Sequence, residues 1–370
     1  MRLTIVAGAR PNFMKIAPLI HALEKLDPEG ARIQYRLVHT GQHYDPKLSA
    51  TFFDELGIPA PHNNLEVGSG TQAEQTAGIM LGFEKELLAH PSDLVIVVGD
   101  VTSTMACLIT AKKLNTKVAH IEAGIRSFDL TMPEEINRMV TDSITDLFFT
   151  TSHFANENLR KAGVPEEKIL FVGNVMIDTL MANRHRFRKP ALWDEMGLKE
   201  KSYIVITLHR PNNVDDPQNL RRLLEAITGS AAGMPVIFPV HPRTRKIISE
   251  NSLTTGQSIK LTDPMGYLEF NYLVERAFAV ITDSGGITEE TTVMGVPCMT
   301  LRDSTERPET CTVGTNELIG TDPSAIQPAM QRLLAGKWKK GGIPELWDGH
   351  AAERIAEILL NLNQDSSGDN

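Results

Sequence analysis

Short apolar runs alternate with helical patterns along the whole chain. Most of these runs are continuous, which is typical of strands in a parallel sheet that is buried on both faces. In the first half they predict strands over residues 3–7, 35–38, 94–98, 118–121, 147–149 and 169–172. Between the first two strands, apolar residues recur at helical spacing over 11–26, and Pro11 suits a first helical turn. This order predicts a doubly wound α/β domain.

A second series of the same kind follows a break in the pattern. The stretch 182–202 contains several arginines and has the features of a connector. Further strands are predicted over 203–207, 236–240, 259–261, 279–282 and 298–301. We therefore predict two α/β domains, residues 1–180 and 181–350, with a cleft between them. A helix over 351–362 packs on one domain or the other, and the polar tail 364–370 is predicted to be disordered.

Composition and charge exclude several classes of protein. The chain has 370 residues, of which 41% are hydrophobic and 22% charged, as in a globular protein of two domains. A net charge of −9 argues against nucleic acid as a partner. No apolar run has the length of a membrane span, and no signal segment precedes the first strand, so we expect no membrane partner. Three scattered cysteines favour buried structural thiols over a disulfide framework, which indicates the reducing cytoplasm.

The segment 283–307 suggests a site for a nucleoside diphosphate. A predicted strand runs into Ser284, Gly285 and Gly286, and a helical run opens at once. The glycines let the backbone approach a ligand, and the free N–H groups of a helix start favour phosphate. Glu290, one turn into the helix, suits a pair of ribose hydroxyls. An ordinary strand–turn–helix corner is the alternative, and Arg307 after the next strand favours the ligand site.

Arg10 and Lys15 follow the first predicted strand. Both can face an anion above its carboxyl end, where ligands bind in open α/β sheets, although solvated cations are the alternative. The chain contains neither G-x-G-x-x-G nor a P-loop sequence, which disfavours a nicotinamide or P-loop site. It also lacks His or Cys pairs at zinc spacing. We therefore expect no metal and no cofactor.

Carboxyl groups gather after two buried strands of the first domain. Asp100 follows one strand, Glu122 lies near the end of the next, and Glu134 and Glu135 open a helix. Carboxyls that share a partly dry site differ in pKa, which supports acid and base roles near neutral pH. Helix capping is an alternative for Asp100, and helix-start electrostatics accounts for Glu135. A purely structural role is harder to give Glu122, because it lies inside an apolar strand.

The second domain offers histidines at two strand ends. His209 ends the first strand and His241 the next, each followed closely by an arginine. Two histidines that face one cleft indicate a functional role more strongly than a single one. Phe270 either packs against a base or belongs to the core, and its spacing alone favours the core.

Together the motifs resemble the non-hydrolysing UDP-N-acetylglucosamine 2-epimerases. They cover nearly the whole chain in the family's order: GARPNFMK, TGQHYD, HIEAGIRSFD, MPEEINR, VGNVMID, TLHRPNN, PVHPRT, DSGGITEE and RDSTERPE. The resemblance implies the GT-B architecture, with two Rossmann-like domains, an interdomain cleft, a C-terminal helix over 351–363 that completes the first domain, and a homodimer.

The resemblance also implies a reaction without a cofactor. UDP leaves C1 and a proton leaves C2, which gives 2-acetamidoglucal, and both return to form UDP-N-acetylmannosamine. Alternatives are an epimerase of a modified sugar of the 2,3-diacetamido uronic acid type, a hydrolysing epimerase, a GT-B glycosyltransferase and a non-catalytic nucleotide-sugar binder. The paired Glu122 and Glu134 favour an epimerase over the transferase.

Site residues carry over motif by motif. The matched catalytic positions are Asp100, Glu122, Glu134, His209 and Lys15. The matched positions for the UDP-sugar are Arg10, Lys15, His209, Phe270, Ser284, Gly285, Gly286, Glu290 and Arg307. For Phe270 the resemblance implies backbone contact with uracil and reverses the expectation from spacing. Some bacterial members bind a second UDP-sugar as activator, but here Tyr44 and Asp45 follow Gln42 and His43, so we expect that site to be absent or altered.

Overall fold

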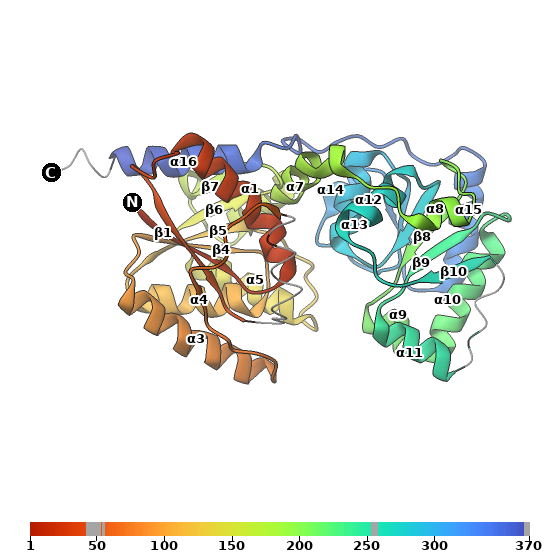
Figure 1. The fold of residues 1–370 in the computed structure, drawn as a ribbon, viewed down its shortest axis with the longest axis horizontal. Coiled ribbons are helices and arrows are strands. Elements are labelled where there is room, and N and C mark those ends of the chain that lie inside the picture. The colour runs from red at the N-terminus through yellow and green to blue at the C-terminus, as the bar shows by residue number, and fades with distance from the viewer. Residues whose placement is uncertain (42–52, 54–55, 252, 254–257, 366–370) are drawn as a thin grey trace. The chain divides into compact units, whose positions relative to one another are not determined.

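The computed structural model describes residues 1–41, 53, 56–251, 253 and 258–365 (Figure 1). The chain divides into two compact units. Unit 1 is Met1–Thr179 together with Glu345–Asn370, and unit 2 is Leu180–Pro344. Each unit has its own sheet and its own apolar core, and each is described by itself.

Unit 1 is built on a parallel sheet with the strand order β3-β2-β1-β4-β5-β6-β7. Its strands are β1 Arg2–Ala7, β2 Gln34–His39, β3 Asn63–Asn64, β4 Leu94–Val98, β5 Lys117–Ala123, β6 Leu147–Thr150 and β7 Ile169–Phe171. Every residue of β4 is buried. Such continuous burial requires helices on both faces of the sheet, which explains the unbroken apolar runs.

The helices of unit 1 alternate with these strands. They are α1 Arg10–Leu26, α3 Gln72–Ala89, α4 Thr102–Lys113, α5 Pro133–Ile144, α6 His153–Lys161, the 3-10 turn η1 Glu166–Lys168, α7 Val175–Asn183, which continues into unit 2, and α16 Ala351–Asp365. Local sequence explains several starts. Thr71 and Glu74 form a capping box before α3, and Pro133 opens α5.

Unit 2 repeats the design with the order β10-β9-β8-β11-β12-β13, again all parallel. Its strands are β8 Ile204–Thr207, β9 Val236–Pro239, β10 Ile259–Thr262, β11 Ala279–Thr282, β12 Cys298–Thr300 and β13 Asn316–Leu318. Its helices are α8 Ala191–Glu195, α9 Pro211–Val214, α10 Pro217–Ser230, α11 Pro242–Glu250, α12 Tyr267–Arg276, α13 Gly285–Met294, α14 Pro308–Thr312 and α15 Ile326–Leu334, with 3-10 turns at Arg184–Arg186 and Pro323–Ala325.

Both sheets reverse their strand order beside their first strand, between β1 and β4 and between β8 and β11. In open α/β sheets, ligands bind outside the carboxyl ends of the strands at such a reversal. The fold therefore singles out the segments that follow β1, β4 and β5 in unit 1, and those that follow β8 and β11 in unit 2. The predicted α/β class with two parallel sheets is confirmed.

All predicted strands overlap observed ones, but two edge strands were not predicted. β3 is a pair of asparagines and β13 is Asn316–Leu318, so neither has the apolar run that marks a buried strand. The connector 182–202 also contains the short helix α8. These elements are short and polar, so their pairing depends on neighbouring strands and not on their own sequence.

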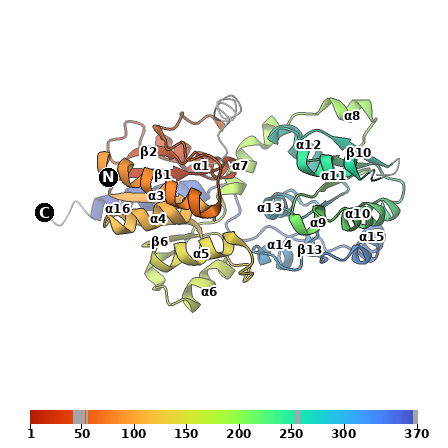
Figure 2. The ribbon, with the colours of Figure 1, turned by 90° about the horizontal axis from the view of Figure 1, so that it is seen from below.

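The C-terminal helix belongs to unit 1, where α16 packs on α1 (Figure 2). The returning chain is held by a bond of 2.9 Å from the Trp347 indole N–H to the Thr151 carbonyl. Asp178 accepts the backbone N–H groups of Ala351 and Ala352 at the start of the helix. At Gly173, with φ +95°, a Cβ would lie 2.1 Å from the Leu346 carbonyl oxygen, so only glycine fits beneath this segment.

Within the described part of the chain, no helix combines the length and the apolar character needed to cross a membrane.

Candidate active site

A buried ion pair lies at the switch point of unit 1. α1 starts directly after β1 and carries Lys15 on its second turn. The Lys15 Nζ lies 2.6 Å from the Glu122 Oε2, and the two side chains are 14% and 3% exposed. A charge buried this deeply is tolerated only with a close counter-charge, so the ion pair fixes the positions of both side chains.

Glu122 has an unusual backbone. Its φ is +69°, and the pairing of β5 with β6 shifts register between Ile121 and Ala123. A non-glycine residue in this conformation costs roughly 1–3 kcal/mol and is retained where surrounding structure enforces it. The bulge therefore redirects the Glu122 carboxylate at the carboxyl end of β5, which is a common arrangement beside active sites.

Asp100, just after β4, is held by two side chains from α5. Arg138 donates to its carboxylate, and the Asn137 side-chain amide donates 2.8 Å to its carbonyl oxygen. The other end of the Arg138 guanidinium lies 2.8 Å from Glu135. Glu135 is fully buried and also accepts the backbone N–H groups of Ser127 and Phe128. Burial would raise the pKa of Glu135, but these hydrogen bonds outweigh it and lower the pKa.

The two glutamates that open α5 have opposite environments. Glu134 is exposed, and no hydrogen bond or ion pair joins it to another residue of the described chain. Glu135 is buried, whereas the sequence alone had explained its presence by the favourable electrostatics of a helix start. Consecutive helical residues point about 100° apart, so one side chain enters the interior while the other faces solvent. Glu122 and Glu135 thus belong to the interior of this sheet edge, and Asp100 is half-buried there.

In unit 2, Asp283 orients His209. Asp283 follows β11 and is fully buried, and its carboxylate lies 2.8 Å from the His209 Nδ1. It also accepts the backbone N–H groups of His209 and Arg210 and the Asn213 amide. Burial alone would raise the Asp283 pKa, but the His209 hydrogen bond and these donors lower it. The ring is therefore fixed through Nδ1, and Nε2 is the nitrogen available to a ligand.

The predicted phosphate segment forms the start of α13. Ser284 precedes the helix, and Gly285 and Gly286 are its first residues. Glu290 is buried one turn later and accepts a hydrogen bond of 2.9 Å from the Tyr267 hydroxyl. Burial raises the pKa of Glu290 to about 7.

The remaining predicted residues have varied surroundings. Arg307 pairs with Glu289 at 2.6 Å. Phe270 is half-buried and packs against a core cluster of unit 2, as its spacing predicted. His241 caps α11 through its own ring nitrogen, a local role that the prediction did not include. The side chain of Arg10 and the residues Gln42 to Asp45 lie outside the described residues.

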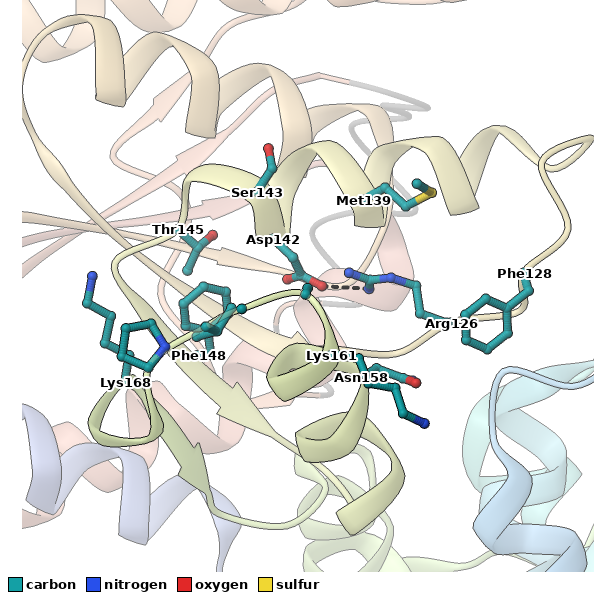
Figure 3. A pocket seen from close by; sticks show the side chains of 14 residues that line it. Arg126, Phe128, Met139, Asp142, Ser143, Thr145, Phe148, Asn158, Lys161 and Lys168 are labelled. Atoms are coloured by element: carbon teal, nitrogen blue, oxygen red, sulfur yellow. Dashed lines mark hydrogen bonds and ion pairs between the residues drawn. The ribbon is translucent and has the colours of Figure 1, made fainter.

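A separate pocket of about 590 Å³ lies between α5 and α6 (Figure 3). Arg126, Phe128 and Lys161 are among its lining residues, and Figure 3 shows the Arg126 guanidinium bonded to Asp142. None of the predicted site residues lines it. Among the described residues there is also no group of three His, Cys, Asp or Glu side chains that could hold a metal ion.

Sequence reasoning missed Arg138 and Asp283 as members of the site. Both lay inside quoted motifs, four residues after Glu134 and directly before Ser284. The available signal was their charge, because a buried carboxylate needs a cation and a strand-end histidine needs an acceptor. Such pairings join residues far apart in the chain, so spacing alone did not reveal them.

The family model for UDP-N-acetylglucosamine 2-epimerase matches residues 25–360. The chain belongs to this family. A Methanocaldococcus jannaschii UDP-N-acetylglucosamine 2-epimerase is 40% identical over 97% of this chain and 99% of its own. The UDP-2,3-diacetamido-2,3-dideoxy-D-glucuronate 2-epimerase of Pseudomonas aeruginosa is 38% identical over 98% of this chain and 100% of its own.

Solved structures give the same result. The M. jannaschii UDP-GlcNAc 2-epimerase in complex with UDP-GlcNAc and UDP superposes with a TM-score of 0.86 at 39% identity, over 98% of this chain and 100% of that one. A putative UDP-N-acetylglucosamine 2-epimerase from Listeria monocytogenes gives 0.88 at 29% identity, over 100% and 97%. The expected family, the GT-B type of α/β fold and the isomerase class are confirmed.

The Lys15–Glu122 pair yields a stability prediction. In Lys15→Met, the buried Glu122 carboxylate loses its cation, and we expect the free energy of unfolding of unit 1 to fall by about 3–5 kcal/mol. Adding Glu122→Gln removes the stranded charge, so the double variant should recover most of the loss. Urea denaturation followed by circular dichroism measures both. A double variant no more stable than Lys15→Met would contradict the buried pair.

Proposed function

We propose that the protein interconverts UDP-N-acetylglucosamine and UDP-N-acetylmannosamine at C2. The observation that carries the proposal is the arrangement of Lys15, Asp100 and Glu122 at the carboxyl ends of β1, β4 and β5, in a chain of this family. Carboxylates beside a cation at this edge suit proton transfer to and from a sugar carbon.

The reaction balances without a redox partner. The C1–O bond to UDP breaks as a proton leaves C2, and the electrons of the C–H bond form the C1–C2 double bond of 2-acetamidoglucal. UDP then adds back to C1 while C2 receives a proton on the other face. We assign acid and base work to Asp100, Glu122 and Glu134. Lys15 forms an ion pair with Glu122, and Arg138 forms one with Asp100.

Residues of unit 2 retain the leaving group in this proposal. The first N–H groups of α13, at Ser284 to Gly286, face the diphosphate, aided by His209, whose ring Asp283 orients. Glu290 accepts the ribose hydroxyls. Arg10, Arg307 and the Phe270 backbone complete the grip on the nucleotide.

A modified sugar is the second candidate substrate. It is favoured by the 38% identity to the P. aeruginosa enzyme named for the 2,3-diacetamido glucuronate nucleotide. The chemistry at C1 and C2 is the same for both sugars, so the residues above keep their roles.

Deuterium exchange tests the reaction. The protein is incubated with UDP-N-acetylglucosamine in deuterated water, without added cofactor, and the reaction is monitored by NMR. Two nucleotide sugars in equilibrium, with deuterium at C2, are expected. Glu122→Gln should lower the rate by at least about 10²-fold. Exchange only with the 2,3-diacetamido uronic acid nucleotide would reassign the substrate. Binding of both without exchange, or release of free N-acetylmannosamine, would overturn the proposal.

The raised pKa of Glu290 predicts pH-dependent binding. Its carboxylate accepts two hydroxyl groups with both oxygens only when it is ionised, so affinity for UDP-N-acetylglucosamine should rise with pH up to about 7 and then level off. Below that pKa the expected loss is up to about tenfold per pH unit. Calorimetric titration from pH 5 to 8 measures it. Glu290→Gln should bind weakly without this dependence, whereas the exposed control Glu225→Gln should behave like wild type. The same pH profile in Glu290→Gln would exclude this role.

We further propose a homodimer formed through the helical layer of unit 1. α3 packs on α4 and α4 on α5, side by side in Figure 1. This layer and the loop before α5 expose large apolar side chains, at Leu81, Leu88, Phe128, Leu130, Ile136, Met139 and Ile144. Exposed apolar groups in such number are typical of an interface.

Sedimentation equilibrium tests the interface. Wild type should have twice the chain mass of 40.8 kDa, and Ile136→Lys should shift the protein toward monomer, because a charge would be buried at the contact. Leu334→Lys on α15 is the matched control, since Leu334 is also exposed but lies in unit 2. A dimer that withstands Ile136→Lys together with Met139→Glu would place the interface elsewhere.

A reducing compartment, the cytoplasm, is the proposed location. Cys107, Cys298 and Cys311 are all unpaired thiols, and the first two are buried. Cell fractionation that finds the protein in an oxidising compartment would contradict this.

A further inference from the structure

A buried imidazole group near the Lys15–Glu122 pair has no part in the proposed chemistry. This group is His120 of β5, which is fully buried. Its Nδ1 lies 2.8 Å from the Asp142 Oδ1, and its Nε2 lies 2.8 Å from the Gly99 carbonyl oxygen. The ring therefore joins α5 to the turn that follows β4.

Both contacts require the ring to donate. A carbonyl oxygen can only accept, so Nε2 carries a proton. Asp142 is nearly buried, and its Oδ2 accepts the Gly124 N–H at 3.0 Å and the Arg126 guanidinium at 2.6 Å. Burial would raise the Asp142 pKa, but His120 and Arg126 lower it. The carboxyl group is therefore ionised, and both of its oxygens act as acceptors. Nδ1 is therefore placed to donate to Asp142, as Nε2 is to the Gly99 carbonyl.

The Gly99 peptide that His120 holds forms a wall of the candidate site. Gly99 has φ +68°, and its N–H donates 3.0 Å to the Ile121 carbonyl. A Cβ at this position would lie 3.1 Å from the Lys15 Nζ and 3.6 Å from the Glu122 Oε2. The Gly99 backbone thus faces the ion pair with no side chain between them, and the next residue is Asp100. A rotation of this peptide would change the position of Asp100 relative to the ion pair.

We propose that His120 is a positioning residue of the epimerase reaction, held by Asp142 on one side and holding the Gly99–Asp100 turn against the Lys15–Glu122 pair on the other. The inference rests on the proposed function and adds to it. His120 touches no reacting atom; it acts through the carbonyl of Gly99. Arg126 lines the pocket of Figure 3, and its guanidinium donates a hydrogen bond to Asp142. It is the last member of this chain of contacts.

The geometry defines which kinetic constant should change. Loss of the Nε2 donor leaves the Gly99 carbonyl buried without its partner, so the peptide rotates to find another. Asp100 then leaves its reactive position relative to the Lys15–Glu122 pair, and misplacement by about 1 Å costs roughly 10²-fold in rate. The groups proposed to hold UDP belong largely to unit 2, so binding should change little. The expected signature is a fall in kcat with KM and the Kd for UDP near their wild-type values.

Three variants separate positioning from general stability. His120→Phe keeps a ring of similar shape but removes both donors, whereas His120→Gln retains an amide N–H that can reach the Gly99 carbonyl. Asp142→Asn keeps the volume and removes the charge that fixes Nδ1. Glu86→Gln is the matched control, because it breaks the buried Arg36–Glu86 pair of the same unit away from the turn. Steady-state kinetics, UDP calorimetry and thermal unfolding are measured for each, together with nitrogen-15 NMR of wild-type imidazoles.

The expected result has three parts. His120→Phe and Asp142→Asn lose about 10²-fold in kcat at nearly constant KM, His120→Gln recovers part of it, and Glu86→Gln keeps kcat even if it unfolds at lower temperature. Wild type shows one buried histidine with both nitrogens protonated. If His120→Phe does not fold, the other two variants carry the test.

Several results would overturn the inference. These are a kcat loss in Asp142→Asn and His120→Gln no larger than in Glu86→Gln, changes in KM that match those in kcat, or an unprotonated nitrogen on His120. Wild-type protein without C2 exchange on either sugar would instead refute the proposed function itself, so the two failures are distinguishable.

Discussion

A carboxylate buried at the end of a parallel strand needs a cation or several hydrogen-bond donors held against it, and this constraint organises the functional edge of both sheets. Strand ends at a switch point are where a ligand can meet the protein, but they are flanked by apolar helices and strands. Without a counter-charge, a buried carboxylate takes up a proton or destabilises the fold. In unit 1, Lys15 meets Glu122 and Arg138 meets Asp100. In unit 2, the Asp283 carboxylate after β11 meets the His209 ring and accepts the backbone N–H groups of His209 and Arg210.

These pairs also determine the direction of each functional group. Lys15 of α1 meets Glu122 from a bulge in β5, and Asp100 from the turn after β4 meets Arg138 of α5, so two separate ion pairs fix these side chains. The same contacts hold strain, since Glu122 keeps a positive φ within this network. A site assembled in this way is pre-organised, which suits a reaction that must stabilise a short-lived elimination product.

Both units bring polar groups to the same edge of their sheet, but the groups differ. Both place their first strand beside the reversal of strand order. Unit 1 brings carboxylates to that edge, whereas unit 2 brings a helix start, an oriented histidine and a buried Glu290 whose pKa lies near neutrality. The common backbone design thus presents carboxylates in one case and a helix start with a histidine in the other, which are the acid–base and nucleotide-binding groups of the proposed function.

The sequence by itself determined the α/β class and nearly every buried strand, because apolar runs are local signals. Strand-end motifs are local signals too, and they supply the candidate site positions. Lys15, Glu122, His209 and Glu290 could be selected in this way. It could not distinguish Glu134 from Glu135, or reveal that Arg138, Asp142 and His120 belong to the same edge. Only the tertiary structure decided those relations. Packing between residues that are far apart in the chain determines which face of a helix turns inward and which cation meets which carboxylate. The spacing of residues along one strand or helix does not specify that packing.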